Sequence, residues 1–152
     1  MKKKLLAALL FGLTYSLTAQ NSPAVYDSTL AKSVGADAYG MKNYIFVLLT
    51  TGDSIVSDKK VRDSLFGGHM QNMIRMEEMG KLVVAGPFHD NTNAWEGIFI
   101  LNTTDMEEAK SLLQSDPAIA NHLLNTSMVP WYGSAAMMKI SQIHARIQKE
   151  SF

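Results

Sequence analysis

Residues 68–90 read GHMQNMIRMEEMGKLVVAGPFHD, and this stretch decides the fold. Its first half predicts an amphipathic helix that begins near His69, because the paired glycines at 67 and 68 weaken a helix before that point. Gly80 is expected to end the helix, since glycine adopts positive φ without strain. The side expected to face the core carries Phe66, Met70, Met73, Ile74 and Glu77.

Four segments have the length and composition of β-strands: 44–49 (YIFVLL), 81–85 (KLVVA), 95–101 (WEGIFIL) and 122–132 (HLLNTSMVPWY). The first is a continuous apolar run, which is typical of a central strand covered on both faces. Gly86-Pro87 ends the second strand, because proline has no amide hydrogen for the ladder. The connection over 86–94 is longer than the commonest hairpin loops, and loops of that size often line sites.

A second helix is predicted over residues 105–115. Thr104 and Glu107 have the spacing of a capping box, in which each side chain satisfies an exposed amide at the helix start. Asp116-Pro117 is expected to break this helix. The side expected to be buried carries Met106, Ala109, Leu112 and Leu113.

The element order is β-α-β-β-α-β, the split βαβ pattern of ferredoxin-like folds. It predicts an α+β domain with one antiparallel sheet and two helices on one face. Alternating chain directions bring the start of the first helix, the 86–94 hairpin and the end of the second helix to one rim. His69, Asp90 and Asp116 then share that rim, and either carboxylate is available to His69.

The amino-acid composition limits which partners and which kinds of chemistry are expected. A chain of 152 residues with 47% hydrophobic residues is expected to form one domain. Basic and acidic residues balance at 14 each, so we expect neither nucleic acid nor anionic lipid as a partner. The chain has no cysteine, which excludes a thiol nucleophile, a thiolate metal site and a disulfide. It carries no glycine-rich phosphate loop or nucleotide fingerprint, so we expect no cofactor.

The N-terminus has the features of an export signal. Lysines at 2–4 precede an apolar run over 5–17, and Ala19 follows as a small residue at which a signal peptidase could cut. We expect residues 1–19 to be a signal peptide and the mature chain to be exported, periplasmic or secreted. The run is shorter than the roughly 20 residues that span a bilayer, so no stable membrane span is expected after cleavage.

The two ends of the mature chain carry weaker patterns. Residues 20–40 contain scattered serines, glycines and a proline, which predict a linker or a loosely packed arm. Isoleucines at 140, 143 and 147 have helical spacing and predict a tail helix within residues 139–152.

Several segments, in order, resemble the YCII-related family over roughly residues 41–138: GHM at 68–70, GKLVVAGPF at 80–88, EGIFIL at 96–101, EEAKSLLQSDPAI at 107–119 and PWYGSA at 130–135. The resemblance implies a ferredoxin-like domain that pairs face to face into a homodimeric α/β barrel, with a pocket between sheet and helices. It also implies that a histidine and an aspartate form a catalytic pair, here His69 and Asp116. The leader, the arm and the tail lie outside the family's usual domain.

The residues themselves leave alternatives open for this site. His69 near a helix N-terminus would favour a neutral imidazole that can act as a base, or it could simply hydrogen-bond a nearby carbonyl. Asp116 could orient that imidazole, or cap a short helix that starts at Pro117. Asp90 is the rival partner, although its place among asparagines is also typical of a turn.

Further residues complete the expected site. Pro87, Phe88, Trp131 and Tyr132 are expected to line a pocket with Asp90, with core packing as the alternative for the aromatic side chains. A metal cluster of His69 and Asp116 with the hairpin residues at 89 and 90 is chemically compatible with zinc or iron. The chain lacks a tight spacing motif for such a cluster, so we expect no metal.

These residues predict acid–base chemistry of the lyase or isomerase type on a small organic substrate. Two alternatives remain. One is a non-catalytic dimer that binds a small hydrophobic ligand, with the rim histidine supplying only a hydrogen bond. The other is a structural dimerisation module without a pocket beside the rim.

Overall fold

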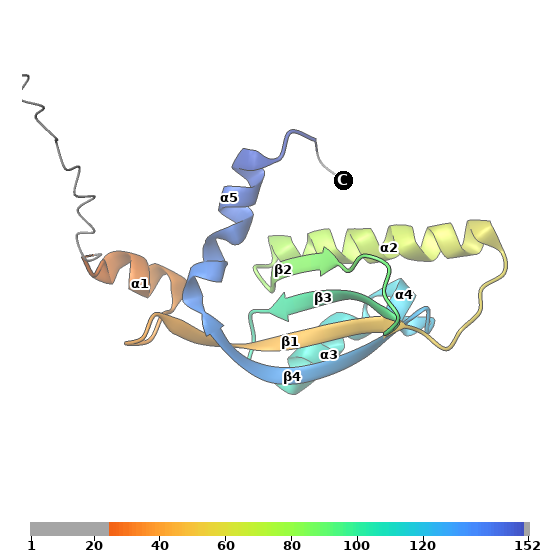
Figure 1. Cartoon of the computed structure of the whole chain (residues 1–152), viewed down its shortest axis with the longest axis horizontal. Coiled ribbons are helices and arrows are strands. Elements are labelled where there is room, and N and C mark those ends of the chain that lie inside the picture. The colour runs from red at the N-terminus through yellow and green to blue at the C-terminus, as the bar shows by residue number, and fades with distance from the viewer. Residues whose placement is uncertain (1–24, 151–152) are drawn as a thin grey trace, which may run out of the picture.

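A four-stranded antiparallel sheet with the order β2-β3-β1-β4 organises the chain (Figure 1). The computed structural model describes residues 25–150, so the predicted signal peptide and the first part of the arm lie outside the described residues. The strands are β1 Met41–Thr51, β2 Leu82–Pro87, β3 Trp95–Leu101 and β4 Leu124–Ser134. With helix α2 (Lys59–Glu78) after β1 and α3 (Met106–Gln114) after β3, the predicted ferredoxin-like α+β fold is confirmed.

Four shorter helices join or flank these elements: α1 Ser28–Val34, α4 Pro117–Ala120, the 3₁₀ helix η1 Ala135–Lys139 and α5 Ile140–Ile147. Helix α1 lies in the stretch expected to be a loosely packed arm. The side chain of Asp27 caps it by accepting the amides of Thr29 and Leu30, and Val34 at its end is buried. Helix α5 occupies the predicted tail helix, and none of its residues is buried.

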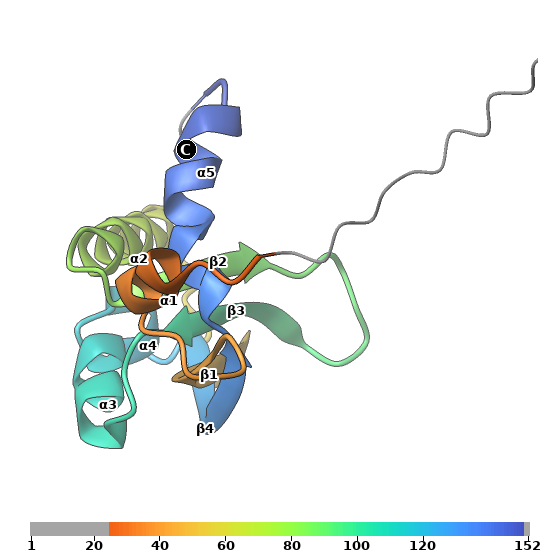
Figure 2. The same cartoon turned by 90° about the vertical axis from the view of Figure 1, so that its left-hand side faces the viewer.

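The main core lies between the sheet and its helices, which Figure 2 shows on one side of the sheet. In β1 the side chains of Ile45, Val47 and Leu49 enter this core, as the alternation of a strand requires. Tyr44 points to the opposite face, where η1 covers a smaller cluster with Val83 and Ile100. Part of this second face is open, since Val129 remains 49% exposed and Trp131 38%.

Helix α2 begins at Lys59, so the prediction that it begins near His69 was wrong. The helix begins ten residues before His69, and Asp58 caps it by accepting the amides of Lys60 and Val61. Gly68 lies inside the helix, at the point where α2 passes close to α4. A Cβ at that position would lie 2.6 Å from Cγ of Pro117, so the glycine permits the contact and does not start a helix.

The expected buried side of α2 was also wrong except for Met73, which is partly buried against the main core. Phe66, Met70 and Ile74 are 40%, 38% and 43% exposed, whereas the buried residues of the helix are His69, Asn72 and Met76. The helix is turned so that two polar side chains face the core, where Asp116 is available as their hydrogen-bond partner. The predicted helix end is confirmed: Gly80 has φ 66°, and the amide of Lys81 donates to the carbonyl of Met76.

The start of α3 differs from the predicted capping box. Asp105, not Thr104, is the N-cap, and its carboxylate accepts the amides of Glu107 and Glu108. Met106 was expected to be buried and is 37% exposed, because it opens the helix just after that cap. His122 was expected in the fourth strand but precedes it, at φ 56°, in the turn that leads into β4.

Candidate active site

His69 and Asp116 form a buried pair between the middle of α2 and the junction of α3 and α4. The distance from Nδ1 of His69 to Oδ2 of Asp116 is 2.8 Å. The side chain of Asp116 is fully buried, and that of His69 is 11% exposed. The structure therefore brings together the two residues that the family resemblance implied, although the sequence separation is 47 residues.

Asp116 reaches this position because it also begins helix α4. Its Oδ1 accepts the amides of Ala118 at 3.0 Å and Ile119 at 3.3 Å, and Pro117 occupies the first turn, where a missing amide hydrogen costs nothing. The two alternatives left open by the sequence, helix cap and histidine partner, are thus realised together. One carboxylate oxygen performs each function.

A second donor fixes the oxygen that faces His69. Nδ2 of Asn72 lies 3.2 Å from Oδ2 of Asp116, and Oδ1 of Asn72 accepts from Nη2 of Arg75 at 2.6 Å. Arg75 also donates to the hydroxyl of Ser115 at 2.6 Å. The sequence reasoning missed this network, although Asn72 follows His69 by three residues and therefore shares its helix face.

The surroundings of Asp116 favour its ionised form. Burial raises the pKa of its carboxyl, but the hydrogen bond and positive charge of His69, with donors from Asn72 and Ile119, outweigh burial and hold the pKa below its usual value. An ionised carboxylate only accepts hydrogen bonds. In the neutral imidazole of His69, the proton therefore resides on Nδ1, and Nε2 carries the free lone pair.

Nε2 of His69 makes no hydrogen bond to a described residue, and it is not fully enclosed by the protein, because every fully buried side-chain nitrogen and oxygen in residues 25–150 has a partner. The imidazole stacks on Phe99 of β3 at a centroid distance of 5.9 Å and meets the edge of Phe66 at 6.3 Å. These ring contacts and the hydrogen bond to Asp116 hold one ring orientation, which leaves Nε2 without a protein partner.

The chemical consequence is an imidazole that can take up or release a proton at Nε2 while a fixed carboxylate stabilises its cationic form. The expected helix-dipole effect does not apply. That effect is confined to the first turn of a helix, and His69 lies ten residues after Lys59, where α2 begins.

The hairpin residues lie elsewhere. Figure 2 shows the connection between β2 and β3 extending away from α2 and α4, so Asp90 is not the partner of His69. Asn91 organises this loop, with Nδ2 donating to the carbonyls of His89 at 2.9 Å and Trp95 at 2.8 Å. The hairpin therefore follows turn chemistry.

The aromatic side chains expected to line a pocket with Asp90 are not assembled around His69. Phe88, next to Pro87, packs on Trp95 within the hairpin at 5.6 Å. Trp131 pairs with Tyr44 at the opposite end of the sheet, near the start of β1. Tyr132 donates its hydroxyl to Asp37, which fastens the segment after α1 to β4.

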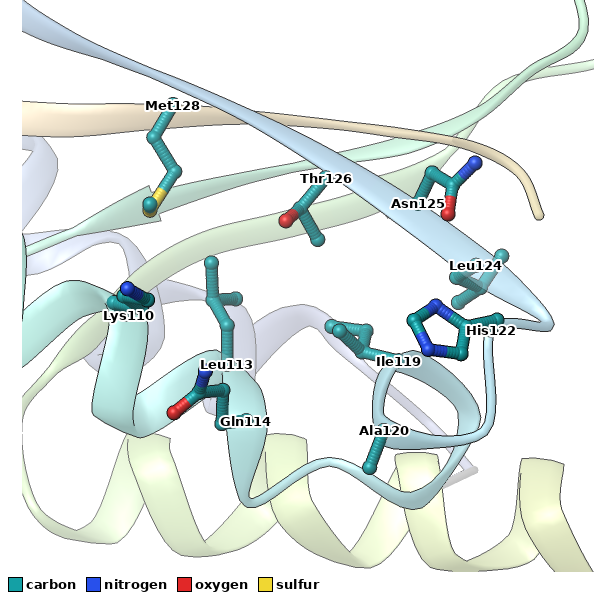
Figure 3. A pocket seen from close by; sticks show the side chains of 10 residues that line it. All are labelled: Lys110, Leu113, Gln114, Ile119, Ala120, His122, Leu124, Asn125, Thr126 and Met128. Carbon is teal, nitrogen blue, oxygen red and sulfur yellow. The ribbon is translucent and has the colours of Figure 1, made fainter. Parts of the chain in front are cut away.

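Two cavities in the described part of the chain lie away from the pair, since neither His69 nor Asp116 lines them. The larger, of about 520 Å³, lies between α3, α4 and β4 (Figure 3). The smaller, of about 200 Å³, lies between α2, β2 and α5. Within residues 25–150, no three histidine, aspartate or glutamate side chains are grouped to hold a metal ion, and no helix is long and apolar enough to cross a membrane.

Comparisons with known proteins add little to this geometry. No family model matches the chain, and no curated protein matches it. A solved structure that is similar in part is the 5-chloro-2-hydroxyhydroquinone dehydrochlorinase of Burkholderia phenoliruptrix AC1100, in complex with 2,5-dihydroxybenzoquinone. It shares 18% identity and a TM-score of 0.43, over 57% of this chain and 92% of that one. The present chain is identified as a ferredoxin-like α+β protein by the order and pairing of its own four strands, independently of this comparison.

Proposed function

We propose that this chain is an exported, YCII-related enzyme in which His69, oriented by Asp116, transfers a proton on a small organic substrate without a cofactor. The observation that carries the proposal is the 2.8 Å pair of Nδ1 and Oδ2, which leaves Nε2 without a partner among the described residues and not fully enclosed. A buried carboxylate hydrogen-bonded to an imidazole orients the ring and stabilises its cationic form, which favours general acid–base catalysis.

The proposed step is of the lyase or isomerase type. Nε2 of His69 removes a proton from a carbon or hydroxyl of the substrate, and Asp116 stabilises the imidazolium that forms. In a lyase, the electron pair left behind forms a double bond and expels a leaving group, which receives the proton from Nε2. In an isomerase, the proton returns to a different atom. Neither route needs an electron acceptor.

The open sheet face supports the proposed homodimer. Val129 and Trp131 are large apolar side chains that remain 49% and 38% exposed beside Phe46 and Tyr44 of β1. A second copy packed face to face would bury them, and contiguous exposed apolar surface is typical of such interfaces. Export is proposed from the lysines at 2–4 and the apolar run over 5–17.

A substrate screen tests the catalytic proposal. The protein is incubated in D₂O with a panel of small enolisable and hydroxylated compounds, and NMR follows loss of C–H signals or appearance of products. Loss of a general acid–base costs about 10²–10⁴-fold in rate, so His69→Gln should lower turnover by at least about 100-fold. His89→Gln, in the hairpin, is the matched control and should keep the wild-type rate. Turnover that survives His69→Gln in a folded protein contradicts the proposal.

One observation favours a second candidate, a non-catalytic dimer that binds a small hydrophobic ligand. Neither of these two cavities is lined by His69, although a catalytic residue normally faces the pocket that holds its substrate. The same screen separates the two. A compound that binds saturably, shifts the signals of Phe66 and Phe99 and is never converted favours the binding protein.

A further inference from the structure

The larger cavity has the size of a small-molecule site and is separate from the His69–Asp116 pair. Its volume of about 520 Å³ lies within the roughly 300–1,000 Å³ that such sites occupy. It opens where β4, an edge strand of the sheet, overhangs helices α3 and α4 (Figure 3). Its lining comprises Lys110, Leu113, Gln114, Ile119, Ala120, His122, Leu124, Asn125, Thr126 and Met128.

The register of the sheet aims β4 side chains into this cavity. Thr126 pairs with Leu49 and Met128 with Val47, and paired residues of an antiparallel ladder share a face. Leu49 and Val47 belong to the core beneath the sheet, so Thr126 and Met128 point to the helix side as well. Leu113 of α3 forms the facing wall, as Figure 3 shows.

A constrained turn places His122 at the end of the cavity. His122 has φ 56°, a conformation that is uncommon for residues other than glycine. Its amide donates to the carbonyl of Ile119, and its own carbonyl accepts the amide of Ser54. Gly52 makes this approach possible, because a Cβ there would lie 2.0 Å from the carbonyl oxygen of His122. The distant segment 52–54 and the end of α4 therefore hold the turn in place.

The charged residues that line the cavity indicate which class of ligand it can bind. Lys110 is its one lysine or arginine, and no aspartate or glutamate lines the cavity. Lys110 forms no ion pair with any residue that the structure describes. Gln114 and Thr126 add neutral hydrogen-bond donors, while leucine, isoleucine and methionine side chains supply an apolar surface.

We infer that this cavity binds a small organic acid, with its carboxylate held by Lys110 and neighbouring donors and its apolar body on Leu113, Ile119 and Met128. A carboxylate gains charge-assisted hydrogen bonds there, and an ammonium of the same length would meet like charge. The site uses neither His69 nor Asp116, and its occupancy is measured without turnover. Its failure and that of the proposed catalytic function are therefore distinguishable.

Titration of the full-length protein with sodium octanoate, followed by calorimetry and methyl NMR, tests this inference. Octanoate should bind at one site per chain and shift the methyl signals of Leu113, Ile119 and Met128. Octylamine should bind at least about tenfold more weakly. A hydrogen bond between charged groups contributes enough binding free energy to change the affinity by about that factor.

Three variants sharpen the test. Lys110→Met keeps the length of the side chain and removes its charge, so it should weaken octanoate binding about tenfold or more. Lys60→Met, on the first turn of α2 and outside the cavity, should leave the affinity unchanged. Thr126→Phe fills the cavity from β4 and should abolish binding while the circular dichroism spectrum stays native. Equal affinities for octanoate and octylamine, an unaffected Lys110→Met variant, shifts that map to the open sheet face, or no binding would each overturn the inference.

Discussion

Asp116 orients the ring of His69 and also caps the start of helix α4. Its Oδ1 caps α4 through the amides of Ala118 and Ile119, while its Oδ2 lies 2.8 Å from Nδ1 of His69. The helix cap fixes the carboxylate, and the carboxylate fixes the imidazole. These hydrogen bonds position the pair without a substrate, and such preorganisation favours proton transfer.

Asp116→Asn should destabilise the protein at neutral pH by about 1–3 kcal/mol, the cost of leaving buried polar groups unsatisfied. Asparagine can still cap α4, but its amide cannot accept from both His69 and Asn72. The folded pKa of Asp116 lies below the unfolded value of about 3.9, so its ionised form stabilises the fold above that pH, and the contribution is lost as the pH falls through the folded pKa.

Urea unfolding between pH 7 and pH 3 checks this prediction, with Asp90→Asn in the exposed hairpin as control. The difference between wild type and Asp116→Asn should narrow toward the acid end, and Asp90→Asn should follow the wild type throughout. A difference that stays constant over the whole range would show that the charge of Asp116 contributes nothing.

Gly68→Ala and Gly67→Ala should have opposite effects. A Cβ at 68 would lie 2.6 Å from the rigid ring of Pro117, whereas a Cβ at 67 has no heavy atom within 4 Å. We expect Gly68→Ala to destabilise by about 1–3 kcal/mol through overpacking between α2 and α4. Gly67→Ala should stabilise by about 0.5–1 kcal/mol, the usual gain of alanine over glycine within a helix. Equal urea midpoints for the two variants would contradict the close packing of α2 on α4.

Asn72→Ala should lower the free energy of unfolding by about 1–3 kcal/mol, because Asp116 and Arg75 each lose a hydrogen-bond partner, and the bond to Asp116 is buried. Gln71→Ala, the exposed neighbour on the same helix, is the control and should change stability by less than about 0.5 kcal/mol. Thermal and urea unfolding measure both. Similar small effects for the two variants would mean that the network is not a stabilising unit.

The open sheet face predicts that the protein forms a dimer. Val129→Glu should convert the proposed dimer to a monomer, because it places a charge in the middle of the apolar face. Val61→Glu on α2 is a matched control, since Val61 is 48% exposed and Val129 49% exposed. Sedimentation velocity distinguishes the states. A wild-type protein that sediments as a monomer at all concentrations would remove the basis for this prediction.

The sequence was sufficient for the fold because its local patterns agree with the topology. The apolar run at 44–49, the stop at Gly80 and the proline at 87 all correspond to strand or helix limits near those positions. The start of α1 was missed because it depends on a cap at Asp27, not on apolar periodicity. The turn at His122 was missed because the distant Gly52 and Ser54 determine it.

The candidate site was predicted only in part, because hydrophobic periodicity does not reveal which polar side chains are buried. Hydrophobic periodicity pointed to Phe66, Met70 and Ile74 as the buried side of α2, but the structure buries the polar residues His69 and Asn72. Their burial is compensated by hydrogen bonds to a residue 44 to 47 positions away, which no local pattern reveals. The Asp116-Pro117 pair was the one local sign, because it is typical of a helix cap.

The protonation of the His69 ring tests the central claim most directly. ¹⁵N NMR of the neutral imidazole should show the proton on Nδ1 and a lone pair on Nε2, because the ionised Asp116 accepts from Nδ1. Asp116→Asn should lose that preference, since an amide can donate to Nδ1 as well as accept from it. A wild-type protein whose neutral His69 carries its proton on Nε2, or whose tautomer is unchanged in Asp116→Asn, would contradict the account.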